Sequence, residues 1–322
     1  MSATPLLDRG PALPRTDGAT RPNFFIVGAP KCGTTALAHY LEQNPRVFVS
    51  NPKEPNYFAR HLTVGPARAQ ADSPQNSLER YLALFADATP NHLAVGDAST
   101  RYLRSRRALL ELRQFAPGAR IIVQLRNPID LVRSWHSQKL LEGQEVEPDL
   151  RKAWSLQWKR EEGRQLPPGL VAADALFYGQ VASLGTQLES LFSIFPREQV
   201  GVLFHEDMVS DPRAFYKQAL RFLCVPSDGR SDFPVLNAGR YHRWPRVEAL
   251  IRRRPQELEW VISRLKLREL GLGRALRRFS TAADVRAPLA PEFRLELIDY
   301  FSPEVDKLEQ LTRRDLRHWL KN

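Results

Sequence analysis

The chain has 322 residues, 43% of them hydrophobic, and a formal net charge of +11. This length suits one large α/β domain with a sizeable core, and no apolar run approaches the roughly 18 residues of a membrane span. The two cysteines, Cys32 and Cys224, exclude a disulfide-rich secreted scaffold and suit a reducing cytosol.

The first 22 residues contain prolines, charges and small side chains without the apolar core of a signal peptide. We therefore predict a disordered tail over residues 1–22, and one cytoplasmic domain over residues 23–322. Short apolar segments alternate with helical patterns and lie near Phe24, Val47, Val95, Ile121 and Val200. This alternation predicts a mainly parallel sheet with helices on both faces.

A strand, a tight loop and a helix follow one another near the start of this domain. Phe24 to Val27 are apolar, Gly28 and Gly33 bound the loop, and a helical pattern begins at Thr34. Backbone N–H groups converge at such a helix N-terminus, and the helix dipole favours negative charge there. Since Lys31 adds a full positive charge, the loop is suited to hold a phosphate or a similar anion.

The spacing of Gly28 and Gly33 matches the nucleotide-binding pattern G-x-x-x-x-G-K-[ST], but Thr34 stands where that pattern has lysine. A nucleoside triphosphatase needs its lysine at that place to reach the β- and γ-phosphates. The lysine of this loop, Lys31, lies two residues before Gly33 instead. A P-loop kinase therefore remains only an alternative.

The string Pro-Lys-Cys-Gly-Thr-Thr resembles the 5′-phosphosulfate loop of sulfotransferases that use 3′-phosphoadenosine-5′-phosphosulfate (PAPS). The resemblance implies a P-loop-like three-layer α/β/α fold with a mainly parallel central sheet. It also implies that Lys31 contacts the oxygen between phosphate and sulfate. Thr34, Thr35 and the backbone amides of the loop would hold the 5′-phosphate.

The next motif follows a short predicted strand, Val47 to Val49. Glu54 lies between two prolines, beside Lys53 and four residues before Phe58. The pattern Lys-Glu-x-x-x-Phe resembles the segment that supplies a glutamate base in heparan-type and related bacterial sulfotransferases. We predict that Glu54 is the general base. The alternative is a loop glutamate paired with Lys53.

Residues 95–103 resemble a family pattern usually written Gly-Glu-x-Ser-Pro-x-Tyr. Asp97 replaces the glutamate and Thr100 replaces the proline. Heparan enzymes often have lysine where Ala98 stands, so an acidic sugar acceptor is less directly supported. We expect Asp97 to orient a substrate or a lysine. The alternative for Asp97 and Ser99 is a strand end followed by a helix cap.

A second basic motif follows the predicted strand over residues 119–125. Arg126 stands at the strand exit, where ligands bind in open α/β sheets, and Pro128 opens a helix that carries Ser134 eight residues after Arg126. The segment resembles the 3′-phosphate site of sulfotransferases, where the planar fork of arginine suits a phosphate. The alternatives are a surface ion pair and a solvated serine. His136 is an alternative general base.

Later segments extend the resemblance to about Tyr241. Residues 178–195 predict one amphipathic helix, and residues 200–204 predict a strand before Glu206 and Asp207. Residues 237–242 resemble the Gly-Arg loop that closes over the cofactor in heparan-type sulfotransferases. Ala238 replaces the usual lysine, and we expect Arg240 or Arg243 to substitute for it.

The net charge is concentrated in residues 240–278, which contain eleven Arg and one Lys against four Glu. Nucleic acid and an anionic membrane surface are two interpretations of such a run. Since no nucleic-acid motif accompanies it, we favour a basic helical face beside a polyanionic cofactor. We therefore predict that residues 238–288 cover the cofactor and that residues 289–322 form closing helices.

Together these motifs predict a PAPS-dependent sulfotransferase that modifies a hydroxyl or amine of a carbohydrate, lipid or secondary metabolite. We expect no metal and no nucleic-acid partner, and peripheral membrane contact and the oligomeric state stay open. The catalytic residues predicted are Lys31 and Glu54. The cofactor-binding residues predicted are Lys31, Cys32, Gly33, Thr34, Thr35, Ala36, Arg126, Ser134, Gly239, Arg240, Tyr241 and His242. The non-enzymatic alternative is a nucleotide- or membrane-surface-binding protein.

Overall fold

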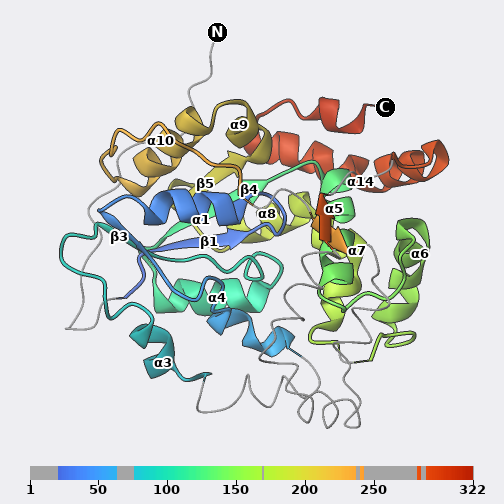
Figure 1. Cartoon of the computed structure of the whole chain (residues 1–322), viewed down its shortest axis with the longest axis horizontal. Helices are drawn as coiled ribbons and strands as arrows, with labels where there is room; N and C mark the ends of the chain where they lie inside the picture. The colour runs from blue at the N-terminus through green and yellow to red at the C-terminus, as the bar shows by residue number, and fades with distance from the viewer. Residues whose placement is uncertain are drawn as a thin grey trace.

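The computed structural model describes residues 21–63, 76–168, 170–236, 240–242, 281–283 and 288–321. Its centre is a five-stranded sheet with the order β2-β3-β1-β4-β5, in which all neighbouring strands are parallel (Figure 1). The strands are β1 (Phe24–Gly28), β2 (Val47–Val49), β3 (Ala94–Asp97), β4 (Arg120–Leu125) and β5 (Val200–Phe204). The expected parallel α/β fold is confirmed.

The central strands are buried on both faces, as their continuous apolar sequences require. Every residue of β1 and of β4 is buried. The chain passes from β1 to β2 and β3 on one side, and then crosses to β4 and β5 on the other. The loops that leave β1 and β4 therefore diverge, and ligands bind at such a switch point in open α/β sheets.

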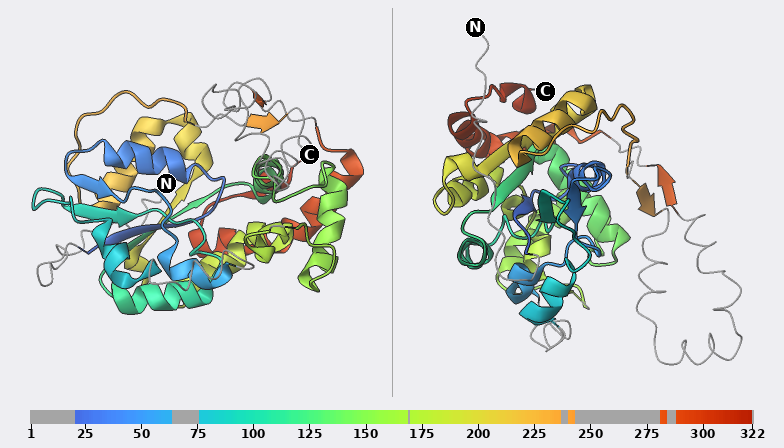
Figure 2. Two further views of the ribbon diagram at one scale, coloured as in Figure 1. Left: turned by 60° about the horizontal axis from the view of Figure 1, so that its bottom comes forward. Right: turned by 90° about the vertical axis from the view of Figure 1, so that its left-hand side faces the viewer.

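Helices cover both faces of the sheet (Figure 2). The buried apolar side chains between helices and sheet form two separate cores. The smaller core lies under α1 (Thr34–Glu42) and α10 (Pro212–Leu223). The larger core lies under α4 (Arg106–Phe115), α5 (Pro128–Leu141), α7 (Tyr178–Ala182), α8 (Leu184–Phe192) and α14 (Pro291–Thr312). The sheet is thus the middle layer of three.

Shorter elements join these layers. They are η1 (Tyr57–Leu62), α3 (Leu78–Ala83), α6 (Leu150–Glu161), η3 (Ala173–Leu176), η4 (Arg197–Gln199), α9 (His205–Ser210) and η5 (Arg317–Leu320). Two further strands, β6 (Arg240–His242) and β7 (Thr281–Ala283), pair antiparallel. The predicted tail (residues 1–22) is described only from residue 21, and Gly239, Arg243 and most of the basic run lie outside the described residues.

The single helix predicted over residues 178–195 is wrong, because the helix breaks at Ser183 into α7 and α8. Glu304 of α14 accepts hydrogen bonds at the start of α8, from Thr186 N at 2.8 Å and from Thr186 Oγ1 at 2.6 Å. A Cβ on Gly185 would lie 2.5 Å from the Glu304 carbonyl oxygen, so the two helices meet closely. The distant α14 thus supplies the cap of α8, which a local pattern cannot reveal.

Within the described residues, no helix has the length and apolar character needed to cross a bilayer. The same part of the chain contains no group of three or more His, Cys, Asp or Glu side chains that could hold a metal ion.

Candidate active site

The loop between β1 and α1 is built around two residues with left-handed backbone conformation. Lys31 has φ 62° and Gly33 has φ 93°. A Cβ on Gly33 would lie 2.5 Å from Met208 Cε and 2.8 Å from Gln124 Nε2, so only glycine fits there. The start of α1 has no side-chain cap and no acidic residue in its first turn. This positive helix end is therefore suited to an anion.

The other residues of the loop contribute backbone more than side chains. Cys32 is completely buried, and burial raises the pKa of its thiol to about 12. A thiol with that pKa is no nucleophile at neutral pH. Thr34 and Ala36 are buried, whereas Thr35 is exposed at the first turn of α1.

Arg126 reaches the same loop from the end of the neighbouring strand. β1 and β4 are adjacent and parallel, so their carboxyl ends lie at one edge of the sheet. Nη1 of Arg126 lies 3.4 Å from the carbonyl oxygen of Lys31, and Nη2 lies 3.4 Å from Asp130 Oδ2. The structure thus brings together two basic motifs that lie 95 residues apart.

Helix α5 lines this edge and contacts Lys31 directly. Asn127 caps the helix by accepting a hydrogen bond from Ile129 N at 2.9 Å. Lys31 Nζ donates to Gln138 Oε1 at 3.1 Å. Ser134 is buried and lies one helical turn before Gln138, on the same side of the helix. Strand β6 also lies against α5 (Figure 1), which brings Arg240–His242 to this edge.

Glu54 stands in the loop before η1, with φ 62°. Its Oε1 lies 2.7 Å from Lys53 Nζ and accepts a hydrogen bond from Thr100 Oγ1 at 3.3 Å. About a third of its side chain is exposed, 35%. The pairing with Lys53, the alternative interpretation of Glu54, is therefore present, but it leaves the Glu54 carboxylate partly exposed and open to a ligand. Thr100 follows β3, the neighbour of β1 on its other side.

The family is decided by a match over most of the described sheet. A family model described as "Sulfotransferase domain" matches residues 21–233, more than half of the chain. The chain belongs to the sulfotransferase family. This membership confirms the family and the fold expected from the motifs, and it indicates an enzyme of sulfuryl transfer.

A solved sulfotransferase from Alicyclobacillus acidocaldarius is similar over nearly the whole chain. It has a TM-score of 0.67 and 25% sequence identity, and the alignment covers 94% of this chain and 100% of that one. Among curated sulfotransferases, mouse heparan sulfate glucosamine 3-O-sulfotransferase 6 is 27% identical over 212 residues, which is 65% of this chain and 55% of that protein.

The membrane-associated sulfotransferase kil1 of Dictyostelium discoideum is 28% identical over 111 residues, which is 34% of this chain and 21% of that protein. The chain therefore spans only part of the length of the curated sulfotransferases that it matches.

Two interpretations of residues outside the loop between β1 and α1 (residues 29–33, called the donor loop after the role predicted for it) change in the light of the structure. His136 of this sulfotransferase is buried, bonds to the Glu147 carbonyl oxygen at 2.8 Å and packs edge-on against Tyr178. Burial lowers its pKa. Because its ring is engaged by a backbone carbonyl oxygen and by Tyr178, the structure does not favour His136 as the base. Asp97 is completely buried and contacts only protein hydroxyl groups among the described residues. All three hydrogen bonds to its carboxylate come from Tyr81, Ser99 and Tyr102, so the described residues offer it no lysine to orient.

Sequence reasoning missed two side chains behind the donor loop. Gln124 of β4 is completely buried, and its Oε1 has no hydrogen-bond partner among the described residues. His205 follows β5, and burial together with the nearby Arg126 lowers its pKa to about 4. Both approach the place where a Cβ of Gly33 would stand. The rule that located Arg126 could have found both, because each residue lies at or near the carboxyl end of a strand of the parallel sheet.

A cationic cluster of Arg101, Arg104 and Lys139 was also missed, and Arg101 lies close enough to Glu54 for their charges to interact. Lys139 Nζ lies 4.0 Å from the centre of the Trp135 ring, and Arg104 lies 5.8 Å from the same ring. Arg104 pairs with Asp174 at 3.1 Å. Burial is the main cause that lowers the pKa of Arg101 and of Lys139, and the neighbouring cations add to it.

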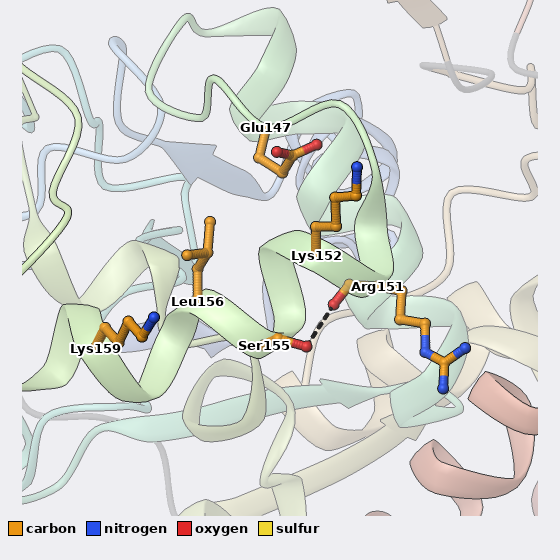
Figure 3. Close-up of a pocket in the computed structure, with 6 residues that line it drawn as sticks. All are labelled: Glu147, Arg151, Lys152, Ser155, Leu156 and Lys159. Carbon is orange, nitrogen blue, oxygen red and sulfur yellow. Dashed lines mark hydrogen bonds between the residues drawn. The ribbon is translucent and has the colours of Figure 1, made fainter.

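A separate groove of about 440 Å³ lies on α6 (Figure 3) and opens to solvent. It is lined by Glu147, Arg151, Lys152, Ser155, Leu156 and Lys159. None of the residues predicted for the donor or the base lines it.

Proposed function

We propose that this chain transfers a sulfuryl group from PAPS to a hydroxyl or amine and releases adenosine 3′,5′-bisphosphate. The observation that carries the proposal is the approach of Arg126 to the Lys31 carbonyl oxygen at 3.4 Å. One basic group follows β1 and the other follows β4, so they stand where the two charged ends of one adenylated sulfate would lie. Membership of the sulfotransferase family supports the same donor.

The loop would bind the 5′ end of the donor. In this proposal the backbone of Cys32, Gly33 and Ala36 and the hydroxyls of Thr34 and Thr35 hold the 5′-phosphate. The Lys31 ammonium contacts the bridging oxygen and stabilises the charge that develops on the leaving phosphate. Lys31 is already within hydrogen-bond reach of α5, 3.1 Å from Gln138.

The other end of the donor would lie along β4 and α5. Arg126 and Ser134 would bind the 3′-phosphate that distinguishes PAPS from ATP. The segment Gly239, Arg240, Tyr241 and His242 would close over it, and the position of β6 against α5 supports this assignment. Residues 238–288 would then cover the donor, within one domain that extends over residues 23–322.

Glu54 would take the proton from the acceptor hydroxyl or amine while the acceptor oxygen or nitrogen attacks sulfur. The bond between sulfur and the bridging oxygen breaks, and Lys31 faces the departing oxygen. Catalysis in such a transfer depends mainly on in-line positioning and electrostatic stabilisation. The hydrogen bond from Thr100 at 3.3 Å and the partial exposure of Glu54 support its role as the base.

The acceptor would carry negative charge. Arg101 lies close enough to Glu54 for their charges to interact, and its Nη2 is buried without a hydrogen-bond partner among the described residues. Arg104 and Lys139 lie close to Arg101, although they pair with Asp174 and Glu142. The names of the mouse relatives point to heparan sulfate, an acidic glycan. We therefore favour a carbohydrate over a lipid or a neutral secondary metabolite.

The free thiols of Cys32 and Cys224 support a cytoplasmic setting.

The test is transfer of label from radiolabelled PAPS into a cell extract, followed by mass spectrometry of the labelled product. The wild-type chain should sulfate an acceptor, and Lys31→Ala should abolish this activity. Lys307→Ala is the matched control, because Lys307 pairs with Glu189 on the outer helices at 2.9 Å. Turnover by Lys31→Ala at the wild-type rate would refute the mechanism.

A second test concerns the donor. Calorimetry should show that PAPS binds more tightly than ATP; the reverse order would favour a kinase.

A further inference from the structure

We propose that Asp97 and Ser99 are positioning residues that hold the Glu54 loop at the reacting centre. This inference rests on the proposed function, in which Glu54 is the base. The end of β3 would thereby fix the Glu54 loop, which lies more than 40 residues earlier in the chain.

The Glu54 loop has a backbone that needs outside support. Glu54 has φ 62° and Asn56 has φ 54°, so two residues other than glycine adopt the left-handed region within three positions. Such conformations cost free energy and persist only when the surroundings impose them. Within the loop, Asn56 Nδ2 donates to the Glu54 carbonyl oxygen at 2.8 Å. A bond inside the loop cannot fix the loop relative to the sheet.

Ser99 supplies the link to the sheet. Its hydroxyl accepts a hydrogen bond from Asn56 N at 3.0 Å and donates to Asp97 Oδ1 at 2.6 Å. Ser99 is completely buried, so water does not compete for either bond. Because the hydroxyl has one proton, the bond to Asp97 turns its lone pairs towards Asn56.

Asp97 in turn is fixed by two tyrosines. Tyr81 and Tyr102 donate their hydroxyl protons to Asp97 Oδ2 at 2.9 and 2.7 Å. Three donors therefore converge on one carboxylate, and only a group that accepts at both oxygens satisfies them all. Asp97 is the last residue of β3 and pairs in register with Phe25 of β1. The base loop is thus tied to the strand beside the donor loop.

The same segment also contacts the base itself. Thr100, next to Ser99, donates to Glu54 Oε1 at 3.3 Å. The end of β3 therefore fixes both the backbone after Glu54 and the carboxylate of Glu54. A base displaced by about 1 Å loses much of its effect, because proton transfer requires close alignment. Removing the Ser99 hydroxyl should consequently reduce catalysis without touching the donor.

The test is a double-mutant cycle of Ser99→Ala and Glu54→Gln, with radiolabelled PAPS at saturation and a fixed amount of cell extract as the acceptor source. We expect Ser99→Ala alone to lower the apparent kcat about 10-fold. Removal of the base itself in Glu54→Gln should lower it about 100-fold or more. The Kd for PAPS, measured by calorimetry, should not change. In the Glu54→Gln background, Ser99→Ala should cause no further loss of kcat.

Ser183→Ala is the matched control, because Ser183 is a half-buried serine between α7 and α8 whose hydroxyl donates to the Gly179 carbonyl oxygen at 2.8 Å. It should lower Tm but leave kcat unchanged. Asp97→Asn is a second variant with nearly unchanged volume, and it should also lower kcat while the Kd for PAPS is retained.

Equal losses from Ser99→Ala in both backgrounds would overturn the inference, since the serine would then not act through Glu54. An unchanged kcat in Ser99→Ala, with a lowered kcat in Glu54→Gln, would overturn this inference alone. An unchanged kcat in Glu54→Gln would remove the base assignment, and the inference would fall with it.

Discussion

At the scale of a single residue, the position of the Arg126 guanidinium is set by its place directly after β4. Its guanidinium is held between the Lys31 carbonyl oxygen and Asp130, both at 3.4 Å. These long contacts leave the planar fork able to turn towards a ligand. A lysine would keep the charge but lose the paired N–H groups that suit phosphate.

Arg126→Lys should raise the KM for PAPS about 10-fold or more, because a good charge-assisted hydrogen bond contributes about 1.5–3 kcal/mol. It should also reduce the preference for PAPS over adenosine 5′-phosphosulfate, which lacks the 3′-phosphate. Initial-rate kinetics with the two donors measure this. The control is Arg107→Lys, an exposed arginine on α4 that pairs with Glu111. An unchanged donor preference would show that Arg126 does not read the 3′-phosphate.

Asp97 gives the folded protein a characteristic pH dependence. Burial raises its pKa from 3.8 to about 6, despite the hydrogen bonds from Ser99, Tyr102 and Tyr81 that lower it. Between these two pH values the folded state binds more protons than the unfolded state. The contribution of Asp97 to stability is therefore fully present below about pH 4 and is lost as pH rises through about 6, by about 3 kcal/mol.

Asp97→Asn removes this titration, so the comparison isolates it from other carboxylates. The free energy of unfolding of the wild type, relative to that of Asp97→Asn, should fall between pH 4 and pH 7. Urea unfolding at a series of pH values measures the difference. A difference that stays constant over this range would mean that the folded pKa of Asp97 is close to its unfolded value.

At the scale of an element, two separate features favour glycine at position 33 of the donor loop. One is its left-handed φ, and the other is the close packing around it. Gly33 has φ 93°, and a Cβ there would overlap Met208 and Gln124. Gly163 has φ 76°, but a Cβ there would meet nothing within 4 Å. At both positions a substituted residue would have to adopt a left-handed backbone conformation. Only at Gly33 would its Cβ also meet neighbouring side chains.

Gly33→Ala should destabilise the fold by more than Gly163→Ala, for which we expect about 1–2 kcal/mol from left-handed strain alone. Gly33→Ala should also weaken PAPS binding, because the loop must move to relieve the overlap. Urea unfolding and calorimetry with PAPS measure the two effects. Equal stability losses and unchanged PAPS affinity in both variants would contradict the close packing described for Gly33.

The elements that the sequence predicted well are those whose pattern lies within one short stretch of the chain. The strands that begin at Phe24, Ala94 and Arg120 are short apolar runs, and their length and the glycine or polar residues beside them identify them. The loop at Lys31 is contiguous too. The break at Ser183 and the environment of Asp97 were not predictable, because Glu304, Tyr81 and Tyr102 reach them through tertiary packing.

At the scale of the whole molecule, the C-terminal segment closes the edge at which the donor is proposed to bind. Asn127 Nδ2, next to Arg126, donates to the Trp319 carbonyl oxygen at 2.9 Å. Trp319 Nε1 donates to Glu206 Oε2 at 3.0 Å, and Arg314 pairs with Glu206 and Asp207 at 2.5 and 2.6 Å. The ends of β4 and β5 are thus joined by residues far along the chain, which supports the closing role predicted for residues 289–322.

Arg314→Ala should lower stability by about 1 kcal/mol, since its partners are a half-exposed pair of carboxylates, and it should also raise the KM for PAPS. Arg317→Ala is the control, because Arg317 is 81% exposed and stands 3.8 Å from Glu309; it should change neither quantity. Urea unfolding and donor kinetics measure both. A stability loss without any change in KM would separate the C-terminal segment from the donor edge.

The bond between Asn127 and Trp319 spans 192 positions. During synthesis Asn127 leaves the ribosome long before Trp319 exists, so a nascent chain can assemble all five strands while this corner is still open. Until the segment around Trp319 has been added and packed, the folded sheet would still lack the contacts that close the edge at which the donor is proposed to bind.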